Sequence, residues 1–469
     1  MSVRRREARI PSATVAALVG DLNAHFGNRI ATSQAVREQH GHTTTWIPNA
    51  PPDAVLFAES AQDAIDAVNI CARHDAPIVG FGTGTSLEGH VNALYGGLCV
   101  DFSRMNRVLA VHAEDLDCVI EPGITRKALN AQLRDTGLFF PIDPGADASL
   151  GGMTATRASG TNAVRYGTMK DNVLSLKVVT GEGKLIRTAS RAKKSSAGYD
   201  LTRLFVGSEG TLGLIVEITL KLAGQPEVIS GGHCPFPDVR SACLATIETI
   251  QSGIPVARIE LLDALQVKAC NAYSKLTLPE TPMLFVEFHG SAASVAEQSR
   301  QFGEIAGGCG GGPFAWTTDP EARTKLWQAR HDAYWACIGL RPGARAFATD
   351  VCVPISRLAD CVEATLRDIA ENRLIAPIVG HVGDGNFHVT PMIDMTSAEE
   401  VEKAEAFAKR LAMRAIEMDG TCTGEHGVGQ NKTPYLEVEH GADVLDMMRS
   451  VKAALDPQNL FNPGKIFRV

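Results

Sequence analysis

Residues 77–89 read Pro77-Ile78-Val79-Gly80-Phe81-Gly82-Thr83-Gly84-Thr85-Ser86-Leu87-Glu88-Gly89. An apolar run, typical of a strand, leads here into a loop in which glycines alternate with hydroxyl residues. Such a loop can present successive backbone N–H groups to a diphosphate. It differs from the Rossmann fingerprint, because no glycine stands at the third position of G-x-G-x-x-G, and no P-loop lysine follows. The stretch therefore indicates a different kind of anion-binding loop or a tight structural turn.

Two later stretches have the same composition. Residues 141–156 read Pro141-Ile142-Asp143-Pro144-Gly145-Ala146-Asp147-Ala148-Ser149-Leu150-Gly151-Gly152-Met153-Thr154-Ala155-Thr156, with Ser159 and Gly160 just beyond. Residues 207–213 read Gly207-Ser208-Glu209-Gly210-Thr211-Leu212-Gly213 and lead into a strand predicted at 214–222. So much glycine, serine and threonine with little charge predicts backbone that lies against a large, partly polar ligand.

A different motif occupies residues 380–388, Gly380-His381-Val382-Gly383-Asp384-Gly385-Asn386-Phe387-His388. Gly-Asp-Gly-Asn predicts a four-residue hairpin loop closed by Val382 and Phe387. His381 and His388 would then be directly opposed, with Cβ atoms about 4.5–5.5 Å apart, which is close enough to share a metal ion. Glu425, in Gly424-Glu425-His426-Gly427, offers a third ligand. Two histidines and one carboxylate are typical of a catalytic metal site; the alternative is a pair of ordinary hairpin histidines.

Composition limits the classes of protein. With 469 residues the chain is long enough for two or three domains, and its net charge of -8 argues against nucleic acid as a partner. No apolar run reaches the ~20 residues that span a bilayer. The 11 cysteines are scattered without a C-x-x-C pair, which indicates reduced thiols. A cytoplasmic location is expected, at the membrane surface as one variant, or a mitochondrial one if the source is eukaryotic.

The three glycine blocks resemble the FAD-binding domain of the vanillyl-alcohol oxidase flavoprotein family. The His381, His388 and Glu425-His426 motifs resemble its D-2-hydroxyacid dehydrogenase branch, whose members act on D-lactate, D-2-hydroxyglutarate or glycolate. The resemblance covers residues 50–469. It implies an α+β fold with a two-subdomain PCMH-type FAD-binding domain and an antiparallel-sheet cap domain with helices on one side.

The resemblance also implies a division of the chain. We expect an N-terminal helical segment at 1–48, the FAD-binding domain at 49–225, the cap domain with the metal site at 226–425, and a segment at 426–469 that returns to the FAD domain. The FAD is expected to be noncovalent, although His90 leaves attachment open. The cofactor-binding residues implied by position are Val79, Gly80, Phe81, Gly82, Thr83, Gly84, Thr85, Ser86, Pro144, Gly145, Ala148, Ser149, Gly151, Gly152, Thr156, Ser159, Gly160, Glu209, Gly210, Gly213, Ile215 and Asn462.

The substrate residues are expected in the second half of the chain. Residues 327–335 predict a helix with Arg330 and Tyr334 on one face. An arginine suits a substrate carboxylate, because its guanidinium pairs with two oxygens, and Asn386 is expected to hydrogen-bond the same group. From the residues alone Arg330 could equally be a surface residue, and the resemblance is what implies an arginine of the substrate site here. The resemblance places a lysine near 347–349 in members that act on hydroxyglutarate. Its absence here favours a monocarboxylate, although Arg341 and Arg345 are nearby.

Several secondary elements are predicted from periodicity. Helices are expected at 12–26, from a Ser60 cap to about 75, at 397–419 behind Ser397, and at 442–455. Strands are expected at 55–57, 173–179, 184–186 and 284–288. Residues 28–52 are expected to be irregular, and residues 307–312 to form a flexible loop.

These features together predict oxidation of a D-2-hydroxy acid, D-lactate above all, to the 2-oxo acid. A zinc or manganese ion on His381, His388 and Glu425 would acidify the substrate hydroxyl, His426 would be the base, and flavin would accept the hydride. The electron acceptor would be a cytochrome, a quinone or an electron-transfer flavoprotein, and the chain could form a homodimer. The alternatives are an iron(II) oxygenase, a flavin-dependent lyase or synthase, and a non-catalytic flavoprotein subunit.

Overall fold

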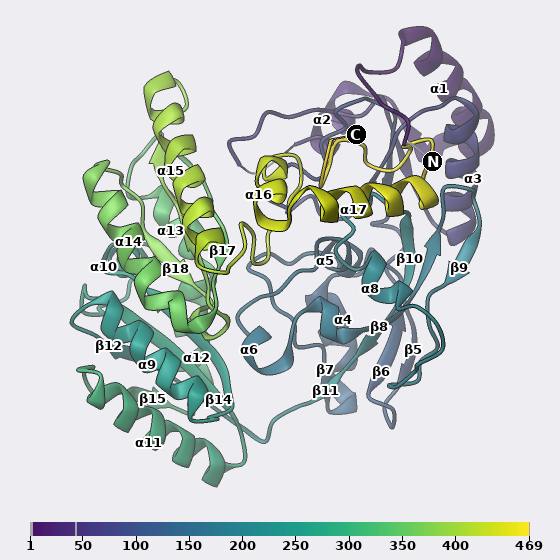
Figure 1. Cartoon of the computed structure of the whole chain (residues 1–469). Helices are drawn as coiled ribbons and strands as arrows, with labels where there is room; N and C mark the ends of the chain where they lie inside the picture. The colour runs from purple at the N-terminus through teal and green to yellow at the C-terminus, as the bar shows by residue number, and fades with distance from the viewer. Residues whose placement is uncertain (1–2, 43–44, 469) are drawn as a thin grey trace. The chain divides into compact units, whose positions relative to one another are not determined.

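The computed structural model describes residues 3–42 and 45–468, which form two compact units (Figure 1). Unit 1 comprises Met1–Ser159, Thr168–Gly224 and Glu425–Val469. Unit 2 comprises Gly160–Gly167 and Gln225–Gly424. The chain therefore passes between the units four times, and the middle of the glycine-rich half contributes a short segment to unit 2.

Unit 1 contains two main sheets. The first has the order β1-β2-β4-β3, in which β2, β4 and β3 are parallel and β1 is antiparallel. The second is antiparallel throughout, in the order β5-β6-β10-β8-β9. A two-stranded β7-β11 pair completes the unit. The strands are β1 Ile30–Ala31, β2 Ala54–Phe57, β3 Ile78–Phe81, β4 Leu98–Asp101, β5 Val108–His112, β6 Asp117–Ile120, β7 Leu138–Phe139, β8 Val173–Val179, β9 Leu185–Arg187, β10 Leu214–Lys221 and β11 Ala223–Gly224.

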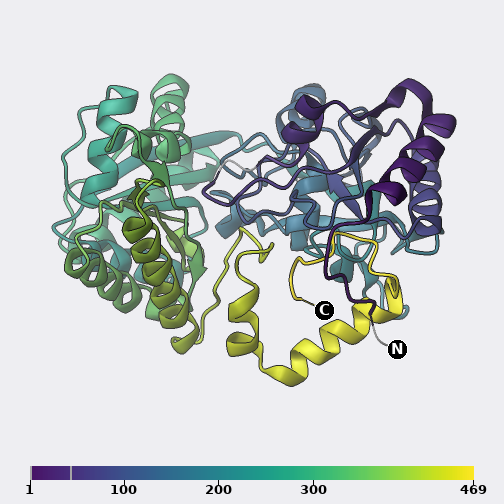
Figure 2. The ribbon, with the colours of Figure 1, turned by 90° about the horizontal axis from the view of Figure 1, so that it is seen from above.

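One apolar core joins the two sheets of unit 1. Leu22 of α1, Val68 of α3, Leu56 of β2 and Val216 of β10 are all buried in it. The N-terminal segment lies beside the C-terminal one in Figures 1 and 2, and Arg6 Nε donates to the Asn459 carbonyl at 2.8 Å. The helices are α1 Ser12–Phe26, α2 Gln34–His40, α3 Ala61–Arg73, α4 Arg126–Leu133, α5 Leu150–Thr156, α7 Met169–Asn172, α8 Leu201–Phe205, α16 Leu436–His440 and α17 Ala442–Leu455.

Unit 2 is built on one antiparallel sheet of order β15-β12-β14-β13-β18-β19-β17, with a short β16-β20 pair. The antiparallel pairing confirms the predicted architecture. Its strands are β12 Val228–Pro235, β13 Val256–Leu262, β14 Met283–Gly290, β15 Ala315–Thr317, β16 Arg345–Ala346, β17 Val351–Cys352, β18 Ile378–Gly380, β19 Asn386–Val389 and β20 Met392–Ile393. Its helices are α6 Ala163–Tyr166, α9 Val239–Gln251, α10 Ala264–Ser274, α11 Ala292–Gly308, α12 Pro320–His331, α13 Ala333–Ile338, α14 Leu358–Glu371 and α15 Ala398–Glu417.

Helices cover both faces of this sheet, which corrects the expectation of helices on one side only. Leu284 and Val286 of β14 pack into a core with α9, α11, α14 and α15, which stand together in Figure 1. Met283 and Phe285, which alternate with them, pack against α10, α12 and α13. Because side chains alternate between the faces of a strand, residues 283–286 of β14 must be apolar on both faces.

Most of the predicted elements are present. Ser60 caps α3 in a capping box with Asp63, and Ser397 caps α15, because both hydroxyls accept backbone N–H bonds of the first turn. Two expectations about irregular segments are wrong. The stretch at 28–52 contains β1 and α2, although Thr43 and Thr44 lie outside the described residues. Helix α11 continues through Gly307 and Gly308, because packing of Phe302 and Ala306 outweighs the low helix propensity of glycine.

The turn before β19 depends on Gly385, and replacing this glycine tests how much strain a side chain would cause there. Its φ is +79°, and an added Cβ would lie 2.0 Å from the Val353 carbonyl oxygen. We expect Gly385→Ala to lower the free energy of unfolding of unit 2 by about 2 kcal/mol or more. Urea titration followed by tryptophan fluorescence measures this, because Trp316, Trp327 and Trp335 belong to unit 2.

Gly253→Ala is the matched control for this change. Gly253 has a φ of +72°, but nothing lies within 4 Å of its added Cβ, so only the backbone strain of about 1 kcal/mol is expected. An equal loss in the two variants would contradict the role of the Val353 contact.

Candidate functional site

The glycine loop after β3 packs on the start of α5 within unit 1. Ser149 caps α5 through its hydroxyl, and its backbone N–H donates to Thr83 Oγ1 at 3.3 Å. An added Cβ at Gly82 would lie 1.9 Å from Ser149 Oγ, so the close approach requires glycine. The first two glycine blocks, about 70 residues apart in sequence, are therefore neighbours.

The third block joins them through Glu209. The Glu209 backbone N–H donates to the carbonyl of Ala155, the last residue but one of α5, at 2.8 Å. Its carboxylate accepts the N–H groups of Val428 and Gly429 at 2.6 and 2.8 Å. Burial alone would raise the pKa of Glu209, but His90, 3.2 Å away, and the two backbone donors lower it. Glu209 is therefore an ionised buried group that ties the C-terminal segment to the glycine blocks.

Asn462 and Lys465 belong to the same cluster. The Asn462 amide donates to the carbonyls of His90 and Glu209, at 3.1 and 2.8 Å. Lys465 is buried, and its ammonium donates to the Asn92 carbonyl at 2.7 Å. Lys465 is therefore not a solvated surface charge. Burial lowers the pKa of Lys465 to about 7 against the opposing effect of Glu209.

The predicted cofactor residues therefore gather in unit 1, with Gly160 as the exception in unit 2. Two features fit a large neutral-to-anionic ligand such as FAD. The loop at 82–86 is free of charged side chains and is only partly buried. His90 Nδ1 is buried and has no hydrogen-bond partner among the described residues. Together with the contacts between the blocks, these features make unit 1 suitable to hold the diphosphate and rings of a dinucleotide.

The predicted hairpin exists in unit 2, but its register differs from the predicted one. His388 pairs with Val379, and a 3-10 turn, Val382–Asp384, replaces the simple four-residue loop. The turn forms because the His381 carbonyl accepts from Asp384 N at 3.1 Å and from Asn386 N at 3.3 Å, and Gly385 supplies the positive φ. The two histidines are still neighbours, since their ring centroids are 5.4 Å apart and the rings are perpendicular.

Each of these rings uses its Nδ1 atom within unit 2. His381 Nδ1 lies 2.8 Å from Glu260 Oε1, and His388 Nδ1 lies 3.3 Å from the Thr349 carbonyl oxygen. Both partners are acceptors, so we assign the proton to Nδ1 in each ring. The Nε2 lone pairs are then the ones suited to a metal ion. A ligating histidine that donates its other N–H to a carboxylate or carbonyl is the usual arrangement around metals.

Arg330 lies on the other side of Glu260. Its Nε and Nη2 atoms are 2.8 and 2.6 Å from Glu260 Oε2, and its side chain is buried. The predicted continuous helix is wrong, because α12 ends at His331 and α13 begins at Ala333 with Asp332 between them. Arg330 and Tyr334 thus belong to two helices. Burial raises the pKa of the Tyr334 phenol.

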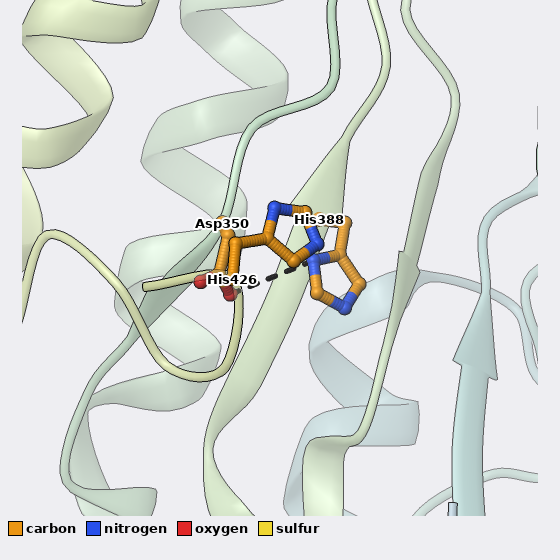
Figure 3. Close-up of side chains that lie close together, drawn as sticks. All are labelled: Asp350, His388 and His426. Atoms are coloured by element: carbon orange, nitrogen blue, oxygen red, sulfur yellow. Dashed lines mark ion pairs between the residues drawn. The ribbon is translucent and has the colours of Figure 1, made fainter. Parts of the chain in front are cut away.

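Asp350 is a second carboxylate beside the histidine pair. Figure 3 shows it with His388, whose Nδ1 is 3.6 Å from Asp350 Oδ1, and also draws His426. Asn386 Nδ2 donates to Asp350 Oδ1 and to the Val351 carbonyl, both at 2.7 Å. Because the two N–H groups of the Asn386 amide are used here, the geometry disfavours its expected role as donor to a substrate carboxylate.

Glu425 and His426 are the first residues of unit 1 after the chain leaves unit 2 at Gly424. Within unit 1, His426 Nδ1 lies 3.6 Å from Glu88 Oε1, and Lys432 Nζ lies 3.4 Å from the same oxygen. Glu88 is buried, which would raise its pKa, but Lys432 and His426 lower it. An ionised Glu88 is therefore a group that can orient the His426 imidazole.

Glu88, Glu260 and Asp350 were missed as site residues by the sequence analysis. Glu88 could have been recognised from the sequence, because it is the single charged residue in the otherwise uncharged stretch at 77–89. Glu260 stands among apolar residues in Ile259-Glu260-Leu261-Leu262, where a lone charge in a buried strand suggests a function. Asp350 had no such signal.

Comparison with known proteins agrees with this architecture. A model of an FAD binding domain matches residues 52–189, and a model of the C-terminal domain of FAD linked oxidases matches residues 225–466. The structure of p-cresol methylhydroxylase with bound substrate superposes with a TM-score of 0.81 at 17% identity, covering 99% of this chain and 98% of that one. At this identity the likeness shows the fold, which is that of the predicted PCMH-type flavoproteins.

The chain belongs to the family of FAD-linked oxidases, and it is an FAD-dependent oxidoreductase of the predicted D-2-hydroxyacid dehydrogenase type. It is 49% identical to the probable mitochondrial D-lactate dehydrogenase of Danio rerio, over 100% of this chain and 95% of the relative. It is 45% identical to the mitochondrial D-lactate dehydrogenase [cytochrome] of Arabidopsis thaliana, over 96% and 80%. The cytoplasmic prediction gains no support from these names. No helix within residues 3–42 and 45–468 has the length and apolarity needed to cross a bilayer.

Lys465 gives the stability a defined pH dependence. An unfolded lysine has a pKa of about 10.4, whereas that of folded Lys465 is about 7. Between these values the unfolded chain binds more protons, so raising the pH favours the folded state. We expect the melting temperature of the wild type to rise relative to Lys465→Met by roughly 2 °C or more between pH 6.5 and 9 in scanning calorimetry.

The exposed Lys221 supplies the control for the Lys465 variant. Lys221→Met removes the same charge at the end of β10 without changing a buried group. Its melting temperature is therefore expected to differ from that of the wild type by the same amount at every pH in this range. If the difference in melting temperature between the wild type and Lys465→Met were also independent of pH, the lowered pKa of Lys465 would be contradicted.

Proposed function

We propose that this protein oxidises D-lactate to pyruvate, using bound FAD as the hydride acceptor and a divalent metal ion. The observation that carries the proposal is the full-length likeness to proteins named D-lactate dehydrogenases, at 49 and 45% identity. Zinc and manganese are the candidate metals, since imidazole and carboxylate ligands suit both.

Oxidation of a 2-hydroxy acid removes a proton from the hydroxyl oxygen and a hydride from C2. His426 is the proposed base, because an imidazole titrates near neutral pH, and Glu88 orients its ring and stabilises the imidazolium that forms. The two electrons leave with the hydride, for which FAD provides the acceptor when bound. The product is the 2-oxo acid, and atoms and charge balance.

His381, His388 and Glu425 are the proposed metal ligands. Support comes from the perpendicular histidine pair in unit 2 and from its engaged Nδ1 atoms. Glu425 follows Gly424, whose added Cβ would lie 2.2 Å from Asn386 Nδ2, and Asn386 is the first residue of β19. A bound divalent ion lowers the pKa of a coordinated hydroxyl, which eases proton transfer to His426.

Arg330 is the proposed partner of the substrate carboxylate. Two of its five N–H groups are used by Glu260, and the remaining edge of the guanidinium can still pair with an anion. Glu260 compensates the buried positive charge before substrate binds. Tyr334, at the start of α13, is proposed to line the same site.

The substrate is proposed to be a monocarboxylate. Arg341, a candidate for a second carboxylate, is paired with Glu400 through contacts of 2.6 and 2.9 Å. Phe347 is buried and Ala348 has no charge, so neither would bind a distal carboxylate. D-2-Hydroxyglutarate is therefore less favoured than D-lactate, and glycolate is the alternative among monocarboxylates.

A cytochrome is the proposed electron acceptor, because the Arabidopsis relative carries that word in its name. Quinone and electron-transfer flavoprotein are the alternatives. Both named relatives are mitochondrial, so a mitochondrial location is proposed if the source is eukaryotic.

The first test is the visible spectrum of the purified protein without oxygen. We expect a flavin band that bleaches on addition of D-lactate and stays unchanged with L-lactate, because only one enantiomer presents its C2 hydrogen to the flavin. Bleaching by D-2-hydroxyglutarate or glycolate but not by D-lactate would contradict the substrate assignment and leave the reaction type in place.

His426→Ala tests the base. We expect the rate of flavin reduction by D-lactate to fall by at least about 100-fold while FAD remains bound, since a general base contributes about 10²- to 10⁴-fold. Stopped-flow absorbance measures the rate, and the ratio of flavin to protein absorbance measures the cofactor. His440→Ala, at the end of α16, is the control and should reduce flavin normally. An unchanged rate in His426→Ala would overturn the assignment.

A further inference from the structure

The Glu260 carboxylate in β13 connects two groups that the proposed reaction uses separately. Its Oε1 atom lies 2.8 Å from His381 Nδ1, and its Oε2 atom accepts from Nε and Nη2 of Arg330 at 2.8 and 2.6 Å. The side chain is buried to 1% exposure. All three residues belong to unit 2, so their mutual geometry is a property of that unit alone.

We propose that Glu260 is a positioning residue that aims His381 Nε2 at the metal ion, while Arg330 holds Glu260 in place. This inference rests on the proposed metal-dependent function. A carboxylate accepts hydrogen bonds only, so it keeps the His381 proton on Nδ1 and the lone pair on Nε2. Without it the imidazole could rotate or carry its proton on Nε2, the atom that the metal needs.

The strand register explains how Glu260 reaches this position. Leu262 of β13 pairs with Val379 of β18, and Val379 pairs with His388 of β19. Directly paired residues point to the same face of a sheet, and Glu260 shares that face because it is two residues from Leu262. The α10, α12 and α13 helices cover this face, and α12 supplies Arg330. Glu260 is therefore supported on a rigid strand beneath the histidine pair.

Arg330 compensates the buried negative charge of Glu260, because two nitrogen atoms of its guanidinium contact Oε2. The two contacts with Arg330 on Oε2 leave Oε1 for His381.

The same sheet contains a matched control. Glu287 of β14 is also buried, lies 2.8 Å from His289 Nε2, and has Arg258 at 3.5 Å. His289 is not a proposed metal ligand, and its Nδ1 atom lies 2.7 Å from the Tyr166 hydroxyl oxygen. Replacing either glutamate by glutamine removes one buried charge next to an arginine and a histidine. Loss of stability is expected for both, and loss of metal affinity for Glu260 alone.

The test is metal binding by the full-length protein after metal removal with a chelator. Zn²⁺ is titrated in competition with a chromophoric chelator, and Mn²⁺ in parallel by the electron spin resonance of the free ion. We expect Glu260→Gln to weaken binding of the tighter of the two ions about 10- to 100-fold, the usual effect of losing such a partner. Glu287→Gln should bind like the wild type.

A second comparison separates positioning from general damage. If Glu260 acts through His381, then Glu260→Gln should weaken binding further by less than about twofold in a His381→Ala background. Near-ultraviolet circular dichroism identifies folded variants. If Glu260→Gln fails to fold, the charge-conserving Glu260→Asp serves instead, because its shorter side chain cannot reach both partners and should also lose affinity.

Four results would count against the inference. Equal metal affinity in the wild type and the Glu260 variant overturns it and leaves the proposed function intact. A similar loss in Glu287→Gln, or an undiminished effect of Glu260→Gln on top of His381→Ala, also overturns it. A wild-type chain that binds neither ion overturns the metal part of the proposed function and this inference with it.

Discussion

Burying a carboxylate in an apolar core is costly unless charged partners or several donors surround it. This constraint organises both units. In unit 1, Glu209 collects His90 and two backbone N–H groups of the C-terminal segment. In unit 2, Glu260 contacts Arg330, which lies on a helix 70 residues further along the chain, and His381, which lies in a loop 121 residues further along. Segments that are distant in sequence thus come together around a few negative charges.

These carboxylates also restrict the side chains that surround them. Asp350 receives the Asn386 amide and the Thr423 hydroxyl, and it lies next to His388. Glu88 lies between His426 and Lys432. Each histidine with a proposed chemical role therefore has a carboxylate or carbonyl oxygen within 3.6 Å of its Nδ1 atom. Such support leaves little freedom in the groups that must meet a substrate, as precise catalysis requires.

Local patterns were sufficient to predict much of this structure. Helices with a clear cap and apolar period, such as α3, α15 and α17, begin and end close to their predicted residues, because capping and amphipathicity act over one or two turns. The hairpin at 380–388 was recognised, but its register was not. A 3-10 turn satisfied by the His381 carbonyl competes with the simple loop, and sequence composition does not distinguish the two. The partner of Arg330 is Glu260, 70 residues earlier in the chain, and only the folded structure brings the two together.

The path of the chain has a practical consequence for anyone who divides this protein. Residues 160–167 interrupt unit 1 and pack in unit 2, where Arg258 holds Asn162 at 2.8 Å and Tyr166 meets His289. The last 45 residues return to unit 1 after unit 2 is complete. No single cut therefore yields two intact pieces. A fragment that stops at Gly224 lacks the donors for Glu209, and one that starts at Gln225 lacks Tyr166, one of the two partners of His289. Either half expressed alone would expose charges that are buried in the whole chain. Circular permutation would join the last segment to the rest of unit 1, but it would leave residues 160–167 separated from the rest of unit 2.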